Sequence, residues 1–184
     1  MKQVEIPYEA LKQDFINELS KLGSEGLHQR GILATSDGDY VTARRMRFVS
    51  NGLTVYCYTD RGTRKCKQIK ANPNVAVVAG FIQIEGVASF KGHPFDETEF
   101  LKVYQETQHE AYESWRAGPY VTHERDMVLI EVVPKRIAWS RYADPESGVE
   151  RGLYILNVAK GEAHRIVDII SMQSDPSEAP AYLE

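Results

Sequence analysis

The sequence has few cysteines, no long apolar run and no excess of basic residues, and each absence excludes a class of protein. Cys57 and Cys66 are nine residues apart, which fits neither a structural zinc site nor a redox pair, so we expect reduced thiols. No apolar stretch approaches the roughly 20 residues of a membrane helix. A net charge of −4 argues against a nucleic-acid-binding protein. Residues 1–7 lack the apolar core of a signal peptide, so we expect a cytoplasmic protein without membrane partners.

The length of 184 residues is typical of one domain with a substantial core. We find no internal repeat and no linker, so residues 1–170 are expected to form this domain. Residues 171–184 are rich in Ser, Pro, Ala and acidic side chains, and we expect a mobile tail.

Short strand-like segments with close turns dominate the chain, and three helices are expected among them. One apolar stripe predicts a helix over Tyr8–Leu22; it consists of Leu11, Phe15, Leu19 and Leu22. Further helices are expected over Thr63–Ala71 and from Asp96 to before Gly118, with Asp96 and Glu99 in capping-box spacing. The predicted strands are Gly31–Ser36, Tyr40–Val49, Leu53–Thr59, Val75–Phe81, Ile82–Lys91, Met127–Val133, Arg136–Arg141 and Leu153–Val158. This order predicts a mainly β fold with an antiparallel barrel and flanking helices.

Basic residues cluster where a strand passes into the second predicted helix. Thr63 is a favourable N-cap residue, which places Arg64 and Lys65 in the first helical turn. Cations there oppose the helix dipole, and a bound anion would remove the conflict. Arg44 lies on the neighbouring strand, and its guanidinium group suits a phosphate. These residues predict a seat for a phosphate dianion, and we interpret it as that of flavin mononucleotide (FMN). A solvated basic face is the alternative interpretation.

Strand alternation separates the basic residues into two sets. Arg44 shares a face with Met46 and Phe48, whereas Arg45 and Arg47 point to the opposite face. The strand expected over Leu53–Thr59 ends with Tyr58 and Thr59, whose hydroxyl groups could meet a polar ring edge.

At these positions the sequence resembles the FMN-binding split-barrel family typified by pyridoxamine 5′-phosphate oxidase. The resemblance covers about residues 31–92. It is carried by the following segments, which match the family pattern in order and spacing: Arg44–Phe48, Tyr58–Thr59, Gly62–Lys65, Gln68–Ile69, Asn72–Pro73 and Ile84–Ala88.

The resemblance implies a split antiparallel β-barrel of about six to eight strands and a homodimer with flavin at the subunit interface. It also implies that Arg44, Arg64 and Lys65 bind the flavin phosphate, that Tyr58 and Thr59 line the flavin, and that Arg45 and Met46 contribute backbone contacts near the ring. The implied activity is that of an FMN-dependent oxidoreductase acting on a small-molecule substrate or electron donor.

The sequence differs from the oxidase pattern at substrate-binding positions. Val49 replaces the substrate-binding Lys of the oxidase, and Phe81 replaces a Gln near the flavin. The oxidase's C-terminal segment with Trp and Arg has no clear match after Arg136. We therefore expect another, unknown substrate, and no residue stands out as an acid–base catalyst.

Trp115 and the function as a whole each have more than one interpretation. Trp115 lies near the end of a predicted helix, where its ring could stack on a flavin or pack in the core. A non-catalytic flavin-binding or sensing protein, a haem-binding split barrel, and a dimeric interaction module with an empty barrel are the alternative functions. The histidines show no metal-ligand spacing, so no metal site is expected; they are His28, His93, His109, His123 and His164.

Overall fold

The computed structural model describes residues 2–23, 30–118, 126–143, 145–146 and 148–167. The predicted tail at 171–184 lies outside these residues. The strands are β1 (Lys2–Glu5), β2 (Gly31–Ser36), β3 (Val41–Met46), β4 (Val49–Asn51), β5 (Thr54–Asp60), β6 (Asn74–Ala79), β7 (Ile82–Phe90), β8 (Met127–Arg141), β9 (Gly152–Asn157) and β10 (Glu162–Val167). The helices are α1 (Tyr8–Leu19), α2 (Arg64–Ala71), α3 (Thr98–Thr107) and α4 (His109–Arg116), and a 3₁₀ turn, η2, covers Pro94–Asp96.

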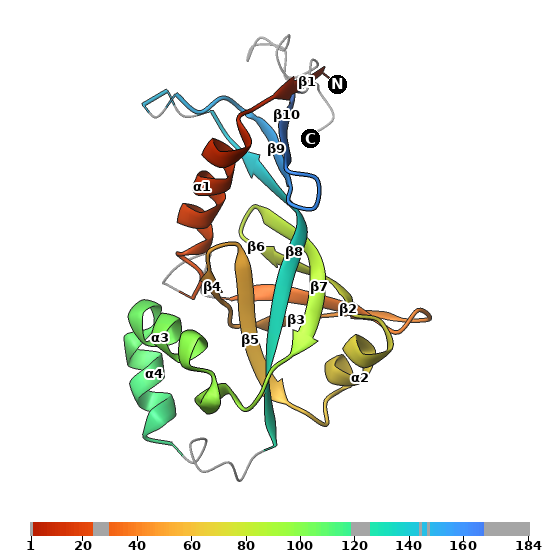
Figure 1. Cartoon of the computed structure of the whole chain (residues 1–184), viewed down its shortest axis with the longest axis vertical. Coiled ribbons are helices and arrows are strands. Elements are labelled where there is room, and N and C mark those ends of the chain that lie inside the picture. The colour runs from red at the N-terminus through yellow and green to blue at the C-terminus, as the bar shows by residue number, and fades with distance from the viewer. Residues whose placement is uncertain (1, 24–29, 119–125, 144, 147, 168–184) are drawn as a thin grey trace, which may run out of the picture.

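The strands form one antiparallel sheet that is split along β8. Its order is β1-β10-β9-β8-β7-β6-β2-β3, with β5 also on β8 and β4 on β5. One edge of β8 pairs with β5 over Met127–Val132 and then with β9 over Arg136–Arg141, while the other edge pairs with β7. The barrel therefore lies at one end of β8 and the β9–β10–β1 sheet at the other (Figure 1). The predicted split antiparallel barrel is confirmed.

Several element boundaries differ from the sequence-based predictions. The two strands predicted on either side of Pro134 are one strand, because a bulge opposite Glu85 and Gly86 accommodates the proline. The strand predicted over Tyr40–Val49 divides into β3 and β4 at Arg47. The long helix from Asp96 is broken at Gln108, and the predicted capping box is absent because Glu97 is the N-cap residue of α3.

Two strands were not predicted, so the described residues contain ten strands instead of six to eight. β1 and β10 pair with each other, and β10 pairs with β9. Both are short, and β1 has no fully buried residue that would mark an apolar face in the sequence. Their formation depends on pairing with the sheet, which a local pattern does not reveal.

The core consists of two clusters on opposite faces of β5 and β8. The first fills the barrel and includes Leu33, Val55 and Ile84, all of which are fully buried. The second lies between the outer face of β5–β8 and helices α3 and α4, and includes Phe100 and Tyr104. Because successive side chains of a strand point to opposite faces, β5 contributes to both clusters.

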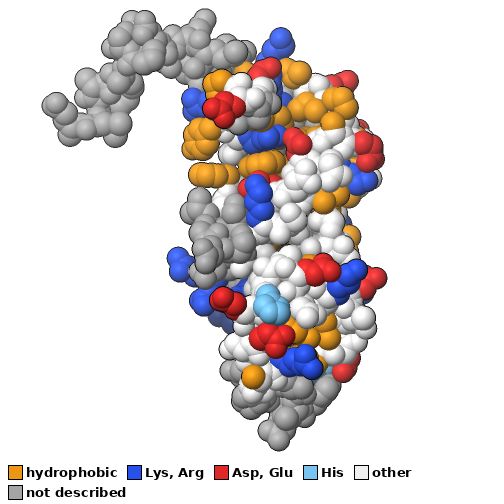
Figure 2. All heavy atoms as spheres, turned by 90° about the vertical axis from the view of Figure 1, so that its left-hand side faces the viewer, with side chains coloured by type: hydrophobic (Ala, Val, Ile, Leu, Met, Phe, Trp, Pro, Cys, Tyr) orange, Lys and Arg blue, Asp and Glu red, His pale blue; other side chains and the backbone are white. Residues whose placement is uncertain are grey.

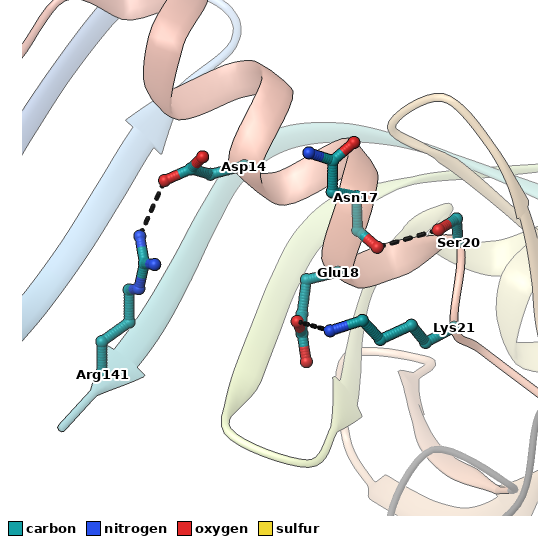
Figure 3. A network of polar contacts seen from close by, with 6 residues as sticks. All are labelled: Asp14, Asn17, Glu18, Ser20, Lys21 and Arg141. Atoms are coloured by element: carbon teal, nitrogen blue, oxygen red, sulfur yellow. Dashed lines mark hydrogen bonds and ion pairs between the residues drawn. The ribbon is translucent and has the colours of Figure 1, made fainter. Parts of the chain in front are cut away.

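Helix α1 packs along the sheet at the junction between its two parts (Figure 1). Its predicted apolar stripe is confirmed, since Leu11, Phe15 and Leu19 are buried. Asp14 on its polar side forms a 2.8 Å ion pair with Arg141 at the end of β8 (Figure 3). The helix ends at Leu19 instead of Leu22, and Leu22 is buried in the turn that follows.

Candidate functional site

The N-terminus of α2 presents free amide groups, and its first turn contains no acidic residue. Thr63 is the N-cap residue, and its carbonyl oxygen accepts hydrogen bonds from the backbone amides of Cys66 (3.1 Å) and Lys67 (3.3 Å). In the part of the chain that the structure describes, the backbone amides of Arg64 and Lys65 have no such acceptor. The Thr63 hydroxyl donates to Cys66 Sγ at 3.4 Å instead of capping the helix. The helix end therefore keeps its positive potential, and its first turn contains no acidic residue.

Lys65 connects this helix end to strand β5. Its Nζ donates a 2.7 Å hydrogen bond to Thr59 Oγ1, and its remaining two N–H groups have no acceptor among the described residues. Burial and the charge of Arg44 lower the pKa of Lys65, although the nearby Cys66, Cys57 and Asp60 act in the opposite direction. The ammonium group is thus held in place while two of its donors remain available.

Both terminal nitrogens of Arg44 donate hydrogen bonds, but none of their acceptors carries a negative charge. Its Nη1 donates to Leu33 O (3.0 Å) and Thr35 Oγ1 (2.8 Å), and its Nη2 donates to Thr42 Oγ1 and, at 3.5 Å, to Gln68 Oε1. All four acceptors are neutral oxygens. Neutral acceptors from the same chain thus occupy the terminal nitrogens of Arg44, and its predicted contact with a phosphate stays a prediction. The positive charge nevertheless remains without a counter-charge in these contacts.

Gln68 organises the acceptors around Arg44. The side chain is 1% exposed on α2, and its Oε1 accepts 2.7 Å hydrogen bonds from both Thr35 and Thr42. Its Nε2 donates to Tyr40 O at 3.1 Å, which ties α2 to the turn between β2 and β3. A buried amide with this many partners holds its neighbours in one arrangement.

Three cations converge at this end of the barrel, and we call Arg44, Arg64 and Lys65 the basic cluster. Burial lowers the pKa of Arg44 most, and the charge of Arg64 lowers it further. The pKa of Lys65 is lowered in the same way by burial and by Arg44. Arg44 is therefore close enough to both Arg64 and Lys65 to be repelled by each, and an anion bound among these groups would relieve the repulsion. Arg64 also lies over the ring of Tyr40, with 5.8 Å between its Cζ and the ring centroid.

An open cleft of about 600 Å³ lies beside the basic cluster. It contains five of the nine residues predicted to bind a cofactor, namely Arg45, Met46, Tyr58, Thr59 and Trp115. Thr59 belongs to both regions, because its hydroxyl group accepts the hydrogen bond from Lys65. The cleft is lined by Arg30, Arg45, Met46, Arg47, Tyr58, Thr59, Asp60, Tyr104, Ala111, Ser114, Trp115 and Met127.

Trp115 forms part of the cleft wall, but both faces of its ring are covered. Tyr58 stacks on it at 4.6 Å between centroids and Phe95 at 4.0 Å, and only 6% of Trp115 is exposed. Of the two sequence-based interpretations, the structure thus supports core packing within this chain. Its role is to fix Tyr58 at the cleft.

The remaining predicted residues lie around α2, so the nine residues form two adjoining groups. Arg44, Thr63, Arg64 and Lys65 surround the helix N-terminus, and the other five line the cleft. Sequence reasoning did not assign Arg30, Arg47, Tyr104 or Gln68 to the site. Gln68 carried a signal, since it follows Arg64 by one helical turn and therefore lies on the same helix face.

The site carries an excess of positive charge, unlike the face of the molecule that α1, α3 and α4 form. Figure 2 shows acidic and basic side chains interspersed over the face formed by α1, α3 and α4. Among the described residues there is no group of three or more His, Cys, Asp and Glu side chains that could hold a metal ion. His28 and His123 lie outside these residues. Nor do the described residues include a helix long and apolar enough to cross a membrane.

Comparisons with known proteins place this geometry in context. The profile of the family described as pyridoxamine 5′-phosphate oxidase matches residues 25–139. General stress protein 26 of Bacillus subtilis (strain 168) is 39% identical over 54 residues, a stretch that covers 29% of this chain and 39% of that relative.

Two solved structures are similar over most of their length. General stress protein 26 from Bacillus anthracis str. Sterne has 26% identity and a TM-score of 0.51, covering 70% of this chain and 92% of its own. A Listeria innocua protein assigned provisionally to the pyridoxamine 5′-phosphate oxidases has 26% identity and a TM-score of 0.51, covering 69% of this chain and 95% of its own.

Proposed function

Because the chain belongs to the pyridoxamine 5′-phosphate oxidase family, we propose that it is a flavoprotein that binds FMN noncovalently and acts as an oxidoreductase. The observation that carries the proposal is that Arg44 lies near Arg64 and Lys65, whose own backbone amides are free at the start of α2, next to a cleft large enough for a ring system.

The basic cluster suits the phosphate of FMN. Two donors of Lys65 and the amides of Arg64 and Lys65 are available to phosphate oxygens, in the part of the chain that the structure describes. Arg44 contributes mainly its charge and its Nε, because its terminal nitrogens are hydrogen bonded to the protein. Charge-assisted hydrogen bonds to phosphate are stronger than neutral ones. FMN is thereby distinguished from riboflavin, which lacks the phosphate.

The cleft suits the flavin ring. Met46 and Tyr58 offer apolar surface, and the Thr59 hydroxyl lies where the cleft meets the basic cluster. Bound flavin supplies the hydride- or electron-transfer chemistry, and the chain binds, orients and shields the ring. We assign no acid–base catalyst and leave the substrate open, since Val49 replaces the lysine expected of the oxidase.

A homodimer is part of the proposal, and the outer face of β2, β3 and β6 supports it. Ile32, Val41 and Val78 are exposed on this face to 42%, 75% and 39%. Between them, Ala34 lies in register with Ala43 on one side and Ala76 on the other, so small apolar side chains share this face with Arg45, which lies in register with Ile32. Such surfaces are typical of subunit contacts.

The absorbance spectrum of the purified protein tests the proposal. We expect a yellow protein that releases FMN on heating, binds added FMN more tightly than riboflavin, and oxidises or reduces a substrate or nicotinamide donor. FMN binding without turnover would favour a flavin-binding or sensing protein. A Soret band after haem addition that depends on one histidine would favour haem. A colourless protein that binds neither would contradict the proposal.

A further inference from the structure

Four aromatic rings form a continuous series from the wall of the cleft to the surface of α4. Tyr58 and Trp115 line the cleft, and their rings stack with 4.6 Å between centroids. The ring of Tyr104 is close to both, with centroids 6.1 Å from Tyr58 and 5.4 Å from Trp115. Tyr112 on α4 is 6.2 Å from Tyr104 and only half-buried, so the series reaches solvent. We call Tyr58, Trp115, Tyr104 and Tyr112 the aromatic series.

Packing alone does not require tyrosine and tryptophan at these positions. Phe95 and Phe100 pack in the same cluster without any polar atom. Buried tyrosine and tryptophan carry polar groups that need hydrogen-bond partners. Yet Trp115 Nε1 is buried without a hydrogen-bond partner among the described residues. An unpaired buried N–H is unfavourable, so a property other than packing accounts better for this choice of side chain.

The rings of the aromatic series differ from phenylalanine in how readily they lose an electron. A strong oxidant removes one electron from a tryptophan or tyrosine side chain, whereas phenylalanine resists this oxidation. Flavin in its ground state is too weak an oxidant for the reaction, but flavin that has absorbed blue light is strong enough. Electrons pass quickly between rings only over short distances, and the centroids of successive rings in the series are 4.6–6.2 Å apart.

From these observations we propose that the aromatic series conducts electrons from the surface of α4 to light-excited flavin in the cleft. The inference rests on the proposed function and adds a light-driven activity to it. In this activity a soluble one-electron reductant such as ascorbate reduces the bound flavin through the protein, without entering the cleft.

Each electron moves through the aromatic series in a fixed order. Tyr58 or Trp115 gives one electron to the excited flavin ring, and electrons from Tyr104 and then Tyr112 fill the vacancy. The indole N–H of Trp115 has no acceptor in the described part of the chain, so the oxidised ring keeps its proton and readily regains an electron. Tyr112 releases its phenolic proton to water, and ascorbate restores it by giving up one electron and one proton. Two such cycles supply the two electrons that reduce the flavin, and water supplies the protons that the flavin takes up.

The fluorescence of FMN bound to the full chain tests the first step. Electron transfer from a neighbouring ring quenches flavin emission, so we expect bound FMN to emit far less than free FMN. The double variant Tyr58→Phe/Trp115→Phe keeps both rings but removes their ready oxidation, and it should restore most of the emission.

Photoreduction tests the later steps. Under anaerobic blue light with ascorbate, the flavin absorbance of the unchanged protein should bleach steadily. Tyr112→Phe should lose most of this rate while the emission of its FMN stays weak, because the vacancy cannot reach the surface and the electron returns. Tyr8→Phe is the matched control, since Tyr8 is also half-buried but lies at the start of α1, near the β9–β10–β1 sheet (Figure 1).

The outcomes separate this inference from the proposed function. If FMN binds but emits as strongly as free FMN, or if Tyr112→Phe bleaches as fast as the unchanged protein, the inference is wrong and the proposed function stands. An equal loss of rate in Tyr8→Phe, or a loss of FMN binding in Tyr112→Phe, would also overturn it by indicating a structural effect. Should the double variant fail to bind FMN, the comparison of Tyr112→Phe with Tyr8→Phe decides. A protein that does not bind FMN at all would overturn both the inference and the proposed function.

Discussion

The Lys65 ammonium group and the Thr59 hydroxyl lie 2.7 Å apart, and this hydrogen bond joins α2 to the end of β5. It places the basic cluster directly beside the cleft, because Thr59 lines that cleft. A ligand with a phosphate at one end and a ring at the other can therefore occupy both regions at once.

Lys65→Ala is expected to weaken FMN binding by about 1.5–3 kcal/mol, the scale of hydrogen bonds to charged groups. Riboflavin lacks the phosphate, so its affinity should change little. Flavin fluorescence titrations with both compounds measure the effect. Lys102→Ala is the control, because Lys102 is an exposed residue of α3. An equal loss for both flavins would show that Lys65 does not contact the phosphate.

Gln68→Leu is expected to lower the free energy of unfolding by about 1–3 kcal/mol, because it leaves buried polar groups without partners. The hydroxyl groups of Thr35 and Thr42 would lose their acceptor, and Tyr40 O would lose its donor. Urea denaturation measures the change. Gln83→Leu is the control, since Gln83 is exposed and bonds only to Glu85 among the described residues. Similar stability of the two variants would contradict the prediction.

Trp115→Ala is expected to destabilise the fold by about 3–5 kcal/mol, as for other large core aromatics. Trp115→Phe should be tolerated better, because a ring would still lie between Tyr58 and Phe95. Thermal denaturation and FMN titration together measure both roles. If Trp115→Phe kept its stability but lost FMN, the tryptophan would contact the flavin directly.

The stability of the protein is expected to fall as the pH rises from about 9 to about 12, in part because of Cys57. Burial raises the pKa of the Cys57 thiol from 9.0 to about 12. Above pH 9 the unfolded chain therefore loses this proton while the folded chain keeps it, which favours unfolding. Denaturation at several pH values should show a shallower decline for Cys57→Ala than for the unchanged protein. Identical slopes would contradict the assignment.

Val78→Lys is expected to dissociate the proposed homodimer, because it replaces an exposed apolar side chain next to Ile32 on the outer face of β2, β3 and β6 with a charge. Light scattering coupled to size-exclusion chromatography measures the mass. Glu110→Lys on α4 introduces a charge change elsewhere and should leave the mass unaltered. A dimer that persists in Val78→Lys would place the subunit contact on another surface.

Local patterns were sufficient for most of the elements and for the position of the helix N-terminus. Thr63 and Pro73 delimit α2 through backbone preferences that hold in any fold, and β2 begins and ends where the alternation predicts. Elsewhere, pairing between distant strands decided the structure against the local pattern. Pro134 lies inside β8, because a bulge opposite Glu85 and Gly86 accommodates a residue that cannot donate a backbone hydrogen bond to the neighbouring strand.

The sequence by itself determined the type and spacing of the basic residues, because strand alternation and helix geometry are local. Only the tertiary structure decided that Gln68 would surround Arg44 with neutral acceptors, that Phe95 and Tyr58 would enclose Trp115, and that Arg30 would join the cleft. These contacts connect residues far apart in the chain. They depend on how the sheet closes and where the helices pack, which no short segment specifies.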